Sequence, residues 1–294
     1  MKNIDKLNEL YSKISNPIDD DEVLLKLLNR FTNERELYTK LINFEKIKTN
    51  ISYKAYEDDL LRENYQLKQE KLLFNSDSLG NDEWFYFNGF TDEKNLKHQF
   101  FINTANGMVH YAALSFLQAC NKESLPYCFK YSLNGRDDKI VIYTTDDFIF
   151  KHLAVLKQIK PKLDEFSLEG IVDHNGKNDE GINEPPFITG KIDKWLGYGA
   201  CEYKNNNLED YHNNRNALIF SSLLKIDKTN DKNSLINLRQ ELVNNSALYN
   251  VDPNNFCFSA EVGEAINSLN NVVKKKKIFL PKCLFGCLAY NKNR

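Results

Sequence analysis

Residues 129–143, FKYSLNGRDDKIVIY, contain two apolar, aromatic-rich runs on either side of Asn134-Gly135. Asparagine and glycine both tolerate positive φ, so this pair predicts a tight turn between two antiparallel strands. Because successive side chains of a strand alternate between its two faces, Lys130 points away from Phe129 and Tyr131. The stretch therefore predicts a strand pair with one apolar face and one face that carries a lysine.

The length of the turn decides which side chains accompany Lys130. A two-residue turn places Lys130 opposite Lys139, with Tyr143 further along the same face. A four-residue turn also keeps Lys130 and Tyr143 together, whereas a three-residue turn separates them. Arg136 lies beside the turn and could reach either face. On the hairpin alone, an ordinary strand pair with solvated lysines is the simpler interpretation, and the alternative is a site for one small anion.

The composition excludes several classes of protein. The chain has 294 residues, of which 41% are hydrophobic and 27% charged, so it should bury a sizeable core as one large domain or two small ones. The formal net charge of -2 gives no basic field for nucleic acid. No apolar run approaches membrane-spanning length, and the first residues lack the features of a secretory signal. We therefore expect a cytoplasmic protein with no nucleic-acid or membrane partner.

The cysteines and histidines give no metal pattern. The six cysteines are scattered, and Cys283-x-x-x-Cys287 lacks the usual zinc-ligand spacing. The five histidines form no metal-spaced pair. We expect reduced thiols, no metal and no cofactor.

The apolar periodicity changes once along the chain. Residues 1 to about 75 show helical spacing in three segments, the first of which is broken at Pro17. From Asp82 onward, residues 84–87 and 98–103 are strand-like, and helices are expected over 104–119 and from 149 until Pro161 ends or kinks the helix. This order predicts an α+β fold, an antiparallel sheet with flanking helices, with an N-terminal helical region at 1–80 and an α+β domain at 81–294.

A further helix is expected over residues 207–224, and its inward stripe includes Tyr211 and Arg215. A buried arginine needs an anion or a carbonyl partner, because burying an unpaired charge is very costly. An internal salt bridge with one of the 41 acids is one interpretation, and a fork that holds phosphate is the other. The polar residues 171–186 predict a loop long enough for a binding role.

Taken in order, these motifs resemble the HopA-type effector family. They are Phe100-Phe101-Ile102-Asn103, Phe129-Lys130, the Arg-x-Asp-x-x-Val-x-Tyr pattern at 136–143, Pro186-Phe187 followed by a glycine pair, and Tyr211 four residues before Arg215. That family includes the lyase proteins of class V lanthipeptide and thioamitide biosynthesis, and it is distantly similar to the OspF and SpvC phosphothreonine lyases. The resemblance covers roughly residues 98 to 225.

The resemblance implies a phosphoserine/phosphothreonine lyase that needs no cofactor. A separate Ser/Thr kinase phosphorylates a precursor peptide, and the lyase removes the phosphate by β-elimination to leave dehydroalanine or dehydrobutyrine. Lys130 is then the candidate base at Cα, and Arg136 and Arg215 are the candidate phosphate-binding forks. Tyr143 is the candidate for a hydrogen bond to phosphate or for help with a proton transfer. A lysine acts as a base only when neutral, a form that desolvation and neighbouring cations favour.

One position departs from the phosphothreonine lyases. Their upstream strand carries Lys-aromatic-His, in which the histidine protonates the leaving group, whereas this chain has Gln99-Phe100-Phe101. The neighbouring Lys97 and His98 are given no catalytic role. The missing acid leaves open a second interpretation, a non-catalytic effector-like protein that binds a host or kinase partner.

Overall fold

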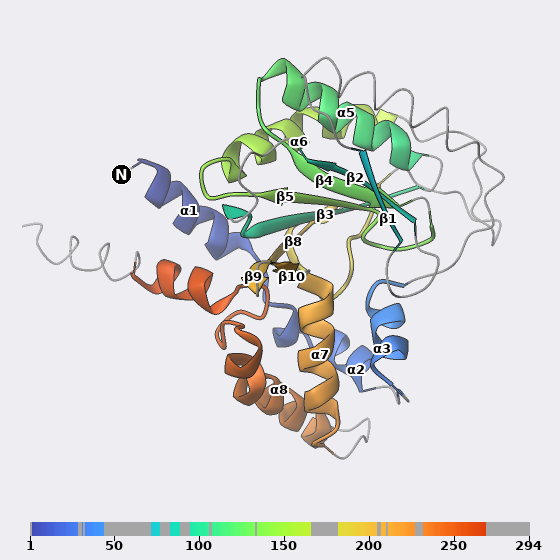
Figure 1. The fold of residues 1–294 in the computed structure, drawn as a ribbon. Helices are drawn as coiled ribbons and strands as arrows, with labels where there is room; N and C mark the ends of the chain where they lie inside the picture. The colour runs from blue at the N-terminus through green and yellow to red at the C-terminus, as the bar shows by residue number, and fades with distance from the viewer. Residues whose placement is uncertain are drawn as a thin grey trace, which may run out of the picture.

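An antiparallel sheet lies between two layers of helices (Figure 1). The computed structural model describes residues 2–28, 31, 33–43, 72–76, 83–88, 95–105, 108–132, 134–165, 182–204, 207–209, 211–226 and 232–268. The sheet has the strand order β1-β2-β4-β5-β3-β8-β7, with β6 paired to β3, and a separate two-stranded ribbon joins β9 to β10. The sheet strands are β1 (Leu72–Ser76), β2 (Glu83–Asn88), β3 (His98–Thr104), β4 (Cys128–Ser132), β5 (Ile140–Thr144), β6 (Ile182–Asn183), β7 (Gly190–Asp193) and β8 (Leu196–Ala200), and the ribbon is β9 (Glu202–Lys204) with β10 (Asn207–Glu209).

Helices cover both faces of this sheet. They are α1 (Lys2–Lys13), α2 (Asp21–Leu27), α3 (Glu34–Leu41), α5 (Val109–Lys122), α6 (Ile149–Glu165), α7 (Tyr211–Leu223) and α8 (Lys232–Ser246), with short 3-10 turns at Pro17–Asp19 and Ala247–Tyr249. Helices α5 and α6 lie over one face, and α7 lies on the other with α2, α3 and α8 (Figure 1). The expected α+β fold with an antiparallel sheet and flanking helices, including helices at the N-terminus, is confirmed.

The alternation of side chains divides the strands between two cores. Phe129 and Tyr131 of β4 join the core that packs α5, α6 and α1. Cys128 of β4 and Tyr143 of β5 join the core that packs α2, α3, α7 and α8. Because each strand is buried on both faces, every described residue of β3, β4 and β5 except Lys130 is buried. Lys130 is half-buried on the α7 face, in contrast to the fully buried residues on either side of it in β4.

The β4–β5 register answers the question of turn length. Lys130 pairs with Val141 and Cys128 pairs with Tyr143, so Lys130 and Tyr143 lie on the same face. This is the register that the four-residue turn predicts. Lys139 therefore lies opposite Ser132, whose backbone N–H donates to the Lys139 carbonyl at 2.9 Å. The two-residue turn, which would pair Lys130 with Lys139, is not the turn that forms.

Two local predictions were wrong, and one half of a third prediction was excluded. Leu72–Ser76 forms strand β1 within the region expected to be helical, because pairing with β2 overrides local periodicity. Asn207–Glu209 pairs with β9, so α7 begins at Tyr211 rather than at 207. Pro161 was expected to end or kink its helix, and it does not end it: α6 continues to Glu165, because a proline in the final turns removes only one backbone donor. Most of the expected loop at 171–186 lies outside the described residues.

Two further sequence expectations are only partly within the described chain. Cys120, Cys128, Cys201 and Cys257 are buried free thiols, whereas Cys283 and Cys287 lie outside the described residues. Within the ranges given above, no helix combines the length and the apolarity needed to cross a bilayer.

Gly199 allows α7 to approach the sheet. A Cβ at this position would lie 2.5 Å from two ring carbons of Tyr211. Tyr211 is fully buried and its hydroxyl donates to the Ile188 carbonyl at 2.8 Å, so the ring cannot move aside cheaply. Gly199 is thus a packing requirement for the helix that carries Arg215.

We expect Gly199→Ala to lower the free energy of unfolding by about 1–3 kcal/mol, the usual cost of overpacking a core. Urea denaturation monitored by circular dichroism measures this loss. The double variant Gly199→Ala with Tyr211→Leu is the control, because it removes the ring that the new methyl meets. An alanine that costs nothing in the wild-type background would show that α7 does not press against β8.

Candidate functional site

Lys130 lies on the α7 face of the sheet beside two aromatic rings. Its Nζ is 4.3 Å from the centroid of Trp84 on β2 and 6.0 Å from the ring of Tyr143 on β5. Trp84 pairs with Ser132, the next residue of β4 on the same face as Lys130. The sheet register therefore fixes the lysine between an indole and a phenol, in a position where cation–π attraction holds the ammonium.

Arg136 reaches the same indole from the β4–β5 connection. The carbon of its guanidinium is 4.1 Å from the Trp84 ring, and the side chain is buried. Nε and Nη2 of Arg136 donate to the two carboxylate oxygens of Asp138 at 2.5 and 3.0 Å. This bidentate pair fixes the plane of the guanidinium, so two cations are held at one ring.

Asp138 also joins the hairpin to the first turn of α7. Its second oxygen is 3.1 Å from Nδ1 of His212, and the His212 ring packs against Phe101 with centroids 4.7 Å apart. Burial opposes ionisation of Asp138, but the Arg136 guanidinium and the contact with His212 hold the pKa of this carboxyl well below its usual range. Asp138 is thus a buried anion that positions a guanidinium and an imidazole together.

Two buried donors at this site have no acceptor among the described residues. They are Nε1 of Trp84 and Nε2 of Gln99. Gln99 pairs with Tyr143 across β3 and β5, and its Oε1 accepts from the backbone N–H of Tyr211 at 3.3 Å. Leaving a buried N–H donor without an acceptor costs about 1–3 kcal/mol. An anionic group with several oxygen atoms could accept hydrogen bonds from these donors and pair with the cations of the site.

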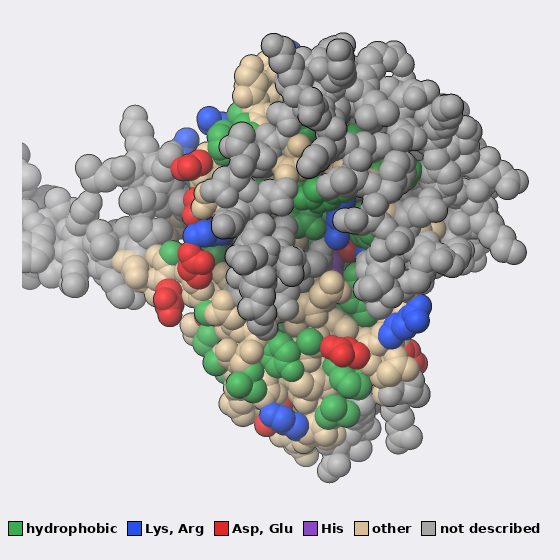
Figure 2. Space-filling model, viewed as in Figure 1, with side chains coloured by type: hydrophobic (Ala, Val, Ile, Leu, Met, Phe, Trp, Pro, Cys, Tyr) green, Lys and Arg blue, Asp and Glu red, His purple; other side chains and the backbone are tan. Residues whose placement is uncertain are grey.

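Figure 2 shows the surface of the molecule in the same view as Figure 1, with the α7 side of the sheet below. Basic, acidic and histidine side chains appear together in a recess near the middle of the view, framed by segments drawn in grey. On the α7 side of the sheet, Lys130 and Arg136 share the Trp84 ring, and Asp138 joins Arg136 to His212.

Arg215 is fixed differently from Arg136. It is buried, its Nε and Nη2 donate to the carbonyl oxygens of Phe256 at 2.7 Å and Phe258 at 3.0 Å, and its Nη1 donates to Oδ1 of Asn214. The guanidinium also lies 4.8 Å from the Tyr211 ring. Two backbone carbonyls and one amide oxygen thus accept hydrogen bonds from this guanidinium. Arg215 therefore ties α7 to residues 256–258, and its role as a phosphate ligand stays a prediction.

The structure brings three of the four candidate residues together. Lys130 contacts the rings of Trp84 and Tyr143, and Arg136 contacts Trp84. Sequence reasoning missed the indole and the Asp138–His212 contact. Trp84 lies far from the hairpin in sequence, whereas Asp138 belongs to the Arg-x-Asp motif itself, so its two-residue spacing from Arg136 was a usable signal.

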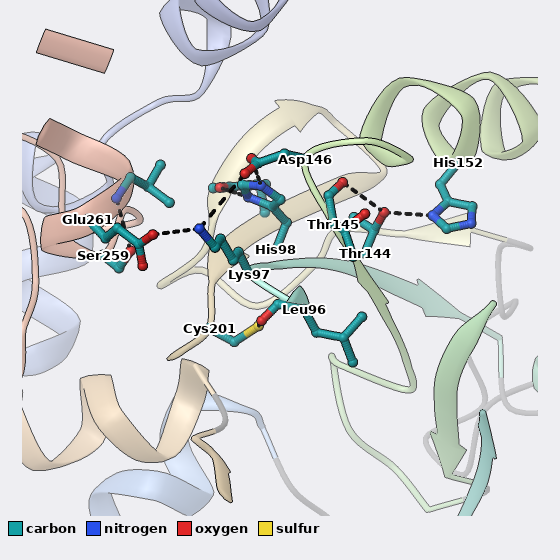
Figure 3. A network of polar contacts seen from close by, with 12 residues as sticks. Leu96, Lys97, His98, Thr144, Thr145, Asp146, His152, Cys201, Ser259 and Glu261 are labelled. Carbon is teal, nitrogen blue, oxygen red and sulfur yellow. Dashed lines mark hydrogen bonds and ion pairs between the residues drawn. The ribbon is translucent and has the colours of Figure 1, made fainter. Parts of the chain in front are cut away.

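Lys97 and His98, at the start of β3, belong to a separate network of polar contacts (Figure 3). Nε2 of His98 lies 2.9 Å from Asp146 and Nδ1 lies 2.8 Å from the Tyr198 hydroxyl, while Lys97 pairs with Glu261 at 2.5 Å. Asp146 is half-exposed but His98 is fully buried, the reverse of a catalytic pair with an accessible imidazole. This network fastens the helical residues 260–268 to the sheet.

Asp137, next to the Arg136–Asp138 pair, makes the free energy of unfolding depend on pH. Burial raises its pKa to about 6, against the opposing effect of Lys139 and hydrogen bonds from Asn103 and Asn43. A carboxyl whose pKa is raised on folding stabilises the fold fully below the unfolded value of about 3.8 and loses that contribution as the pH rises through about 6.

We expect Asp137→Asn to flatten the stability profile between about pH 4 and pH 6, by at most about 3 kcal/mol. Thermal unfolding of both proteins across this pH range measures the effect. Asp147→Asn, on an exposed acid, is the matched control and should leave the slope in place. Parallel profiles for wild type and Asp137→Asn would contradict the raised pKa.

No protein-family model matches the chain, and no curated protein matches it in sequence. Among solved structures, the chain is similar to the effector protein from Pseudomonas syringae pv. tomato strain DC3000, with a TM-score of 0.50 and 11% identity over 86% of this chain and 98% of that chain. It is also similar to the effector protein from Pseudomonas syringae pv. syringae strain 61, with a TM-score of 0.48 and 14% identity over 77% and 90% of the two chains. The likeness to the pv. tomato protein shows a common fold.

Proposed function

We propose that the chain is a phosphoserine/phosphothreonine lyase that removes phosphate from a phosphorylated precursor peptide by β-elimination, in lanthipeptide-type peptide biosynthesis. The observation that carries the proposal is the convergence of Lys130 and Arg136 on Trp84, with Tyr143 beside the lysine. A separate Ser/Thr kinase would supply the phosphorylated peptide.

The reaction uses each side chain in a defined role. Lys130, once it has lost its own proton, would take the proton from Cα; the electrons of the Cα–H bond would form the Cα=Cβ double bond, and the Cβ–O bond would break to release phosphate. Arg136, held by Asp138, would stabilise the negative charge that grows on the leaving phosphate. Tyr143 would donate a hydrogen bond to a phosphate oxygen. Arg215 would assist only through a rearrangement of its present carbonyl contacts.

The buried donors support an anionic substrate at this face. The N–H groups of Trp84 and Gln99 lack acceptors among the described residues, and phosphate oxygens are strong acceptors. Both donors lie on strands that also border Lys130 or Tyr143. A phosphorylated side chain that enters here would satisfy donors that the described part of the chain leaves unsatisfied.

Mass spectrometry of a phosphoserine/phosphothreonine peptide from the natural precursor tests the proposal. The expected product has lost phosphoric acid and adds a thiol, as a dehydro residue does. Release of phosphate with restoration of the hydroxyl would overturn elimination in favour of a phosphatase.

The alternative is a non-catalytic effector-like protein that binds a host or kinase partner. The likeness of the fold to a Pseudomonas syringae effector protein favours this second candidate. An intact cognate phosphopeptide after incubation, combined with stable binding of that peptide or its kinase, would support it.

A further inference from the structure

A cavity of about 380 Å³ opens between α1, α6 and the turn that joins β7 to β8. Its apolar floor belongs to the core of the α5 and α6 side, whereas Lys130 lies on the α7 face. The floor consists of Leu10, Phe150, Leu153, Trp195 and Leu196. The volume is within the range of small-molecule sites in proteins, and the floor offers an aromatic and aliphatic surface.

Three lysines surround the mouth of this cavity. Lys6 and Lys13 come from α1, and Lys157 comes from α6. They gather around Glu9, whose carboxylate accepts a hydrogen bond from Lys13 at 2.7 Å. That hydrogen bond lowers the pKa of Glu9 first, and the charges of Lys157 and Lys6 lower it further. The rim therefore already holds one carboxylate of the chain itself among three cations.

We propose that this cavity binds a small organic carboxylate with an apolar body, such as a medium-chain fatty acid. The chain of the ligand would lie on the Trp195 floor, and its carboxylate would take a place among the rim lysines. The charge of the rim fits this class, because three lysines outnumber the two acids that line the cavity, Glu9 and Asp193. Asp193 accepts a hydrogen bond from the Trp195 indole at 3.2 Å, so it also fixes the floor.

Removal of the Glu9 carboxylate is expected to strengthen binding of the ligand. Because Glu9 occupies the position that the ligand carboxylate would take, it competes for the same lysines. Removing this acid with Glu9→Gln should strengthen binding by about two- to fivefold, whereas a purely apolar cavity would be indifferent to the change.

Octanoate titrated into the Trp84→Phe variant tests the site, because the chain has two tryptophans and Trp195 is then the remaining indole. We expect a saturable change in its fluorescence, and binding about tenfold weaker for 1-octanol and octylamine. Isothermal titration calorimetry on the wild-type chain repeats the measurement without relying on the variant. Equal affinity for octanoate and 1-octanol, or no saturable binding at millimolar octanoate, would overturn the proposal.

Three variants locate the site. Lys13→Gln combined with Lys157→Gln should weaken octanoate binding about fivefold. Ala154→Phe, at an exposed residue of α6 that lines the cavity, should fill it and reduce binding by at least about tenfold. Lys162→Gln is the matched control, since it lines a separate cavity of about 160 Å³ between α5 and α6. Unchanged binding in Ala154→Phe would place the ligand elsewhere and contradict the proposal.

Discussion

Lys130→Ala is expected to lower the rate of phosphate elimination by about 10³-fold, within the range that a positioned general base supplies. The lysine is the half-buried residue of β4 and lies over the rings of Trp84 and Tyr143. Alanine removes the amine but leaves the strand pairing with Val141 intact. The loss should therefore appear in kcat, measured by mass spectrometry of the dehydro product over time.

Two controls separate the chemistry of Lys130 from its packing. Lys130→Met keeps the length and apolar stem of the side chain but has no amine, so it should be as inactive as Lys130→Ala. Lys151→Ala, at an exposed lysine of α6, should retain wild-type activity. An active Lys130→Met protein that makes the dehydro product would remove Lys130 from the mechanism while leaving the lyase activity in place.

Arg215→Ala is expected to lower the free energy of unfolding by about 3–5 kcal/mol. The substitution removes a buried guanidinium and its hydrogen bonds to the Phe256 and Phe258 carbonyls, of which the Phe258 carbonyl keeps the backbone N–H of Asp252 at 3.1 Å. It also removes a tie between α7 and a segment distant in sequence, so the loss affects the packing of two elements. Urea denaturation of the variant measures the effect, and the midpoint should fall without a new transition.

Arg239→Ala is the matched control for this substitution. Arg239 also donates to a backbone carbonyl, that of Ile18 at 2.9 Å, and pairs with Asp21, but its side chain is 34% exposed. Water can replace these contacts, so we expect a loss of about 1 kcal/mol. Similar losses in the two variants would show that burial of Arg215 adds nothing to the fold.

Stability also separates the two interpretations of Arg215. A phosphate ligand that is not needed for folding would leave the unfolding curve unchanged and alter only the KM for the phosphopeptide. The carbonyl contacts predict instead that Arg215→Ala lowers the free energy of unfolding, whatever its effect on the KM. Arg215→Lys should recover little stability, because an ammonium cannot donate in the planar fork that reaches Phe256 and Phe258 together.

The sequence predicted the parts of the site that are close together along the chain. The Asn134-Gly135 pair predicted the hairpin, and a two- or four-residue turn would place Lys130 and Tyr143 on one face, as the register of β4 and β5 does. Local spacing also indicated that Arg215 faces inward on a helix, and it is buried. These features depend on the period of a strand or a helix, which neighbouring residues are sufficient to define.

Contacts between distant segments could not be read in the same way. Trp84 meets Lys130 only because β2 pairs with β4, and His212 meets Asp138 only because α7 begins against β3. Arg215 was expected to need an anion or a carbonyl partner, and the structure supplies the backbone carbonyls of residues 256 and 258. Nothing in a local pattern distinguishes a carbonyl partner from a carboxylate.

By itself, the sequence determined the class of fold, the hairpin and the face that carries Lys130, because hydrophobic alternation acts through adjacent residues. The tertiary structure alone decided which cations share the Trp84 ring, which carbonyls hold Arg215 and where the lysines of α1 and α6 meet. Those pairings follow from strand order and helix docking, which are set by the burial of whole faces.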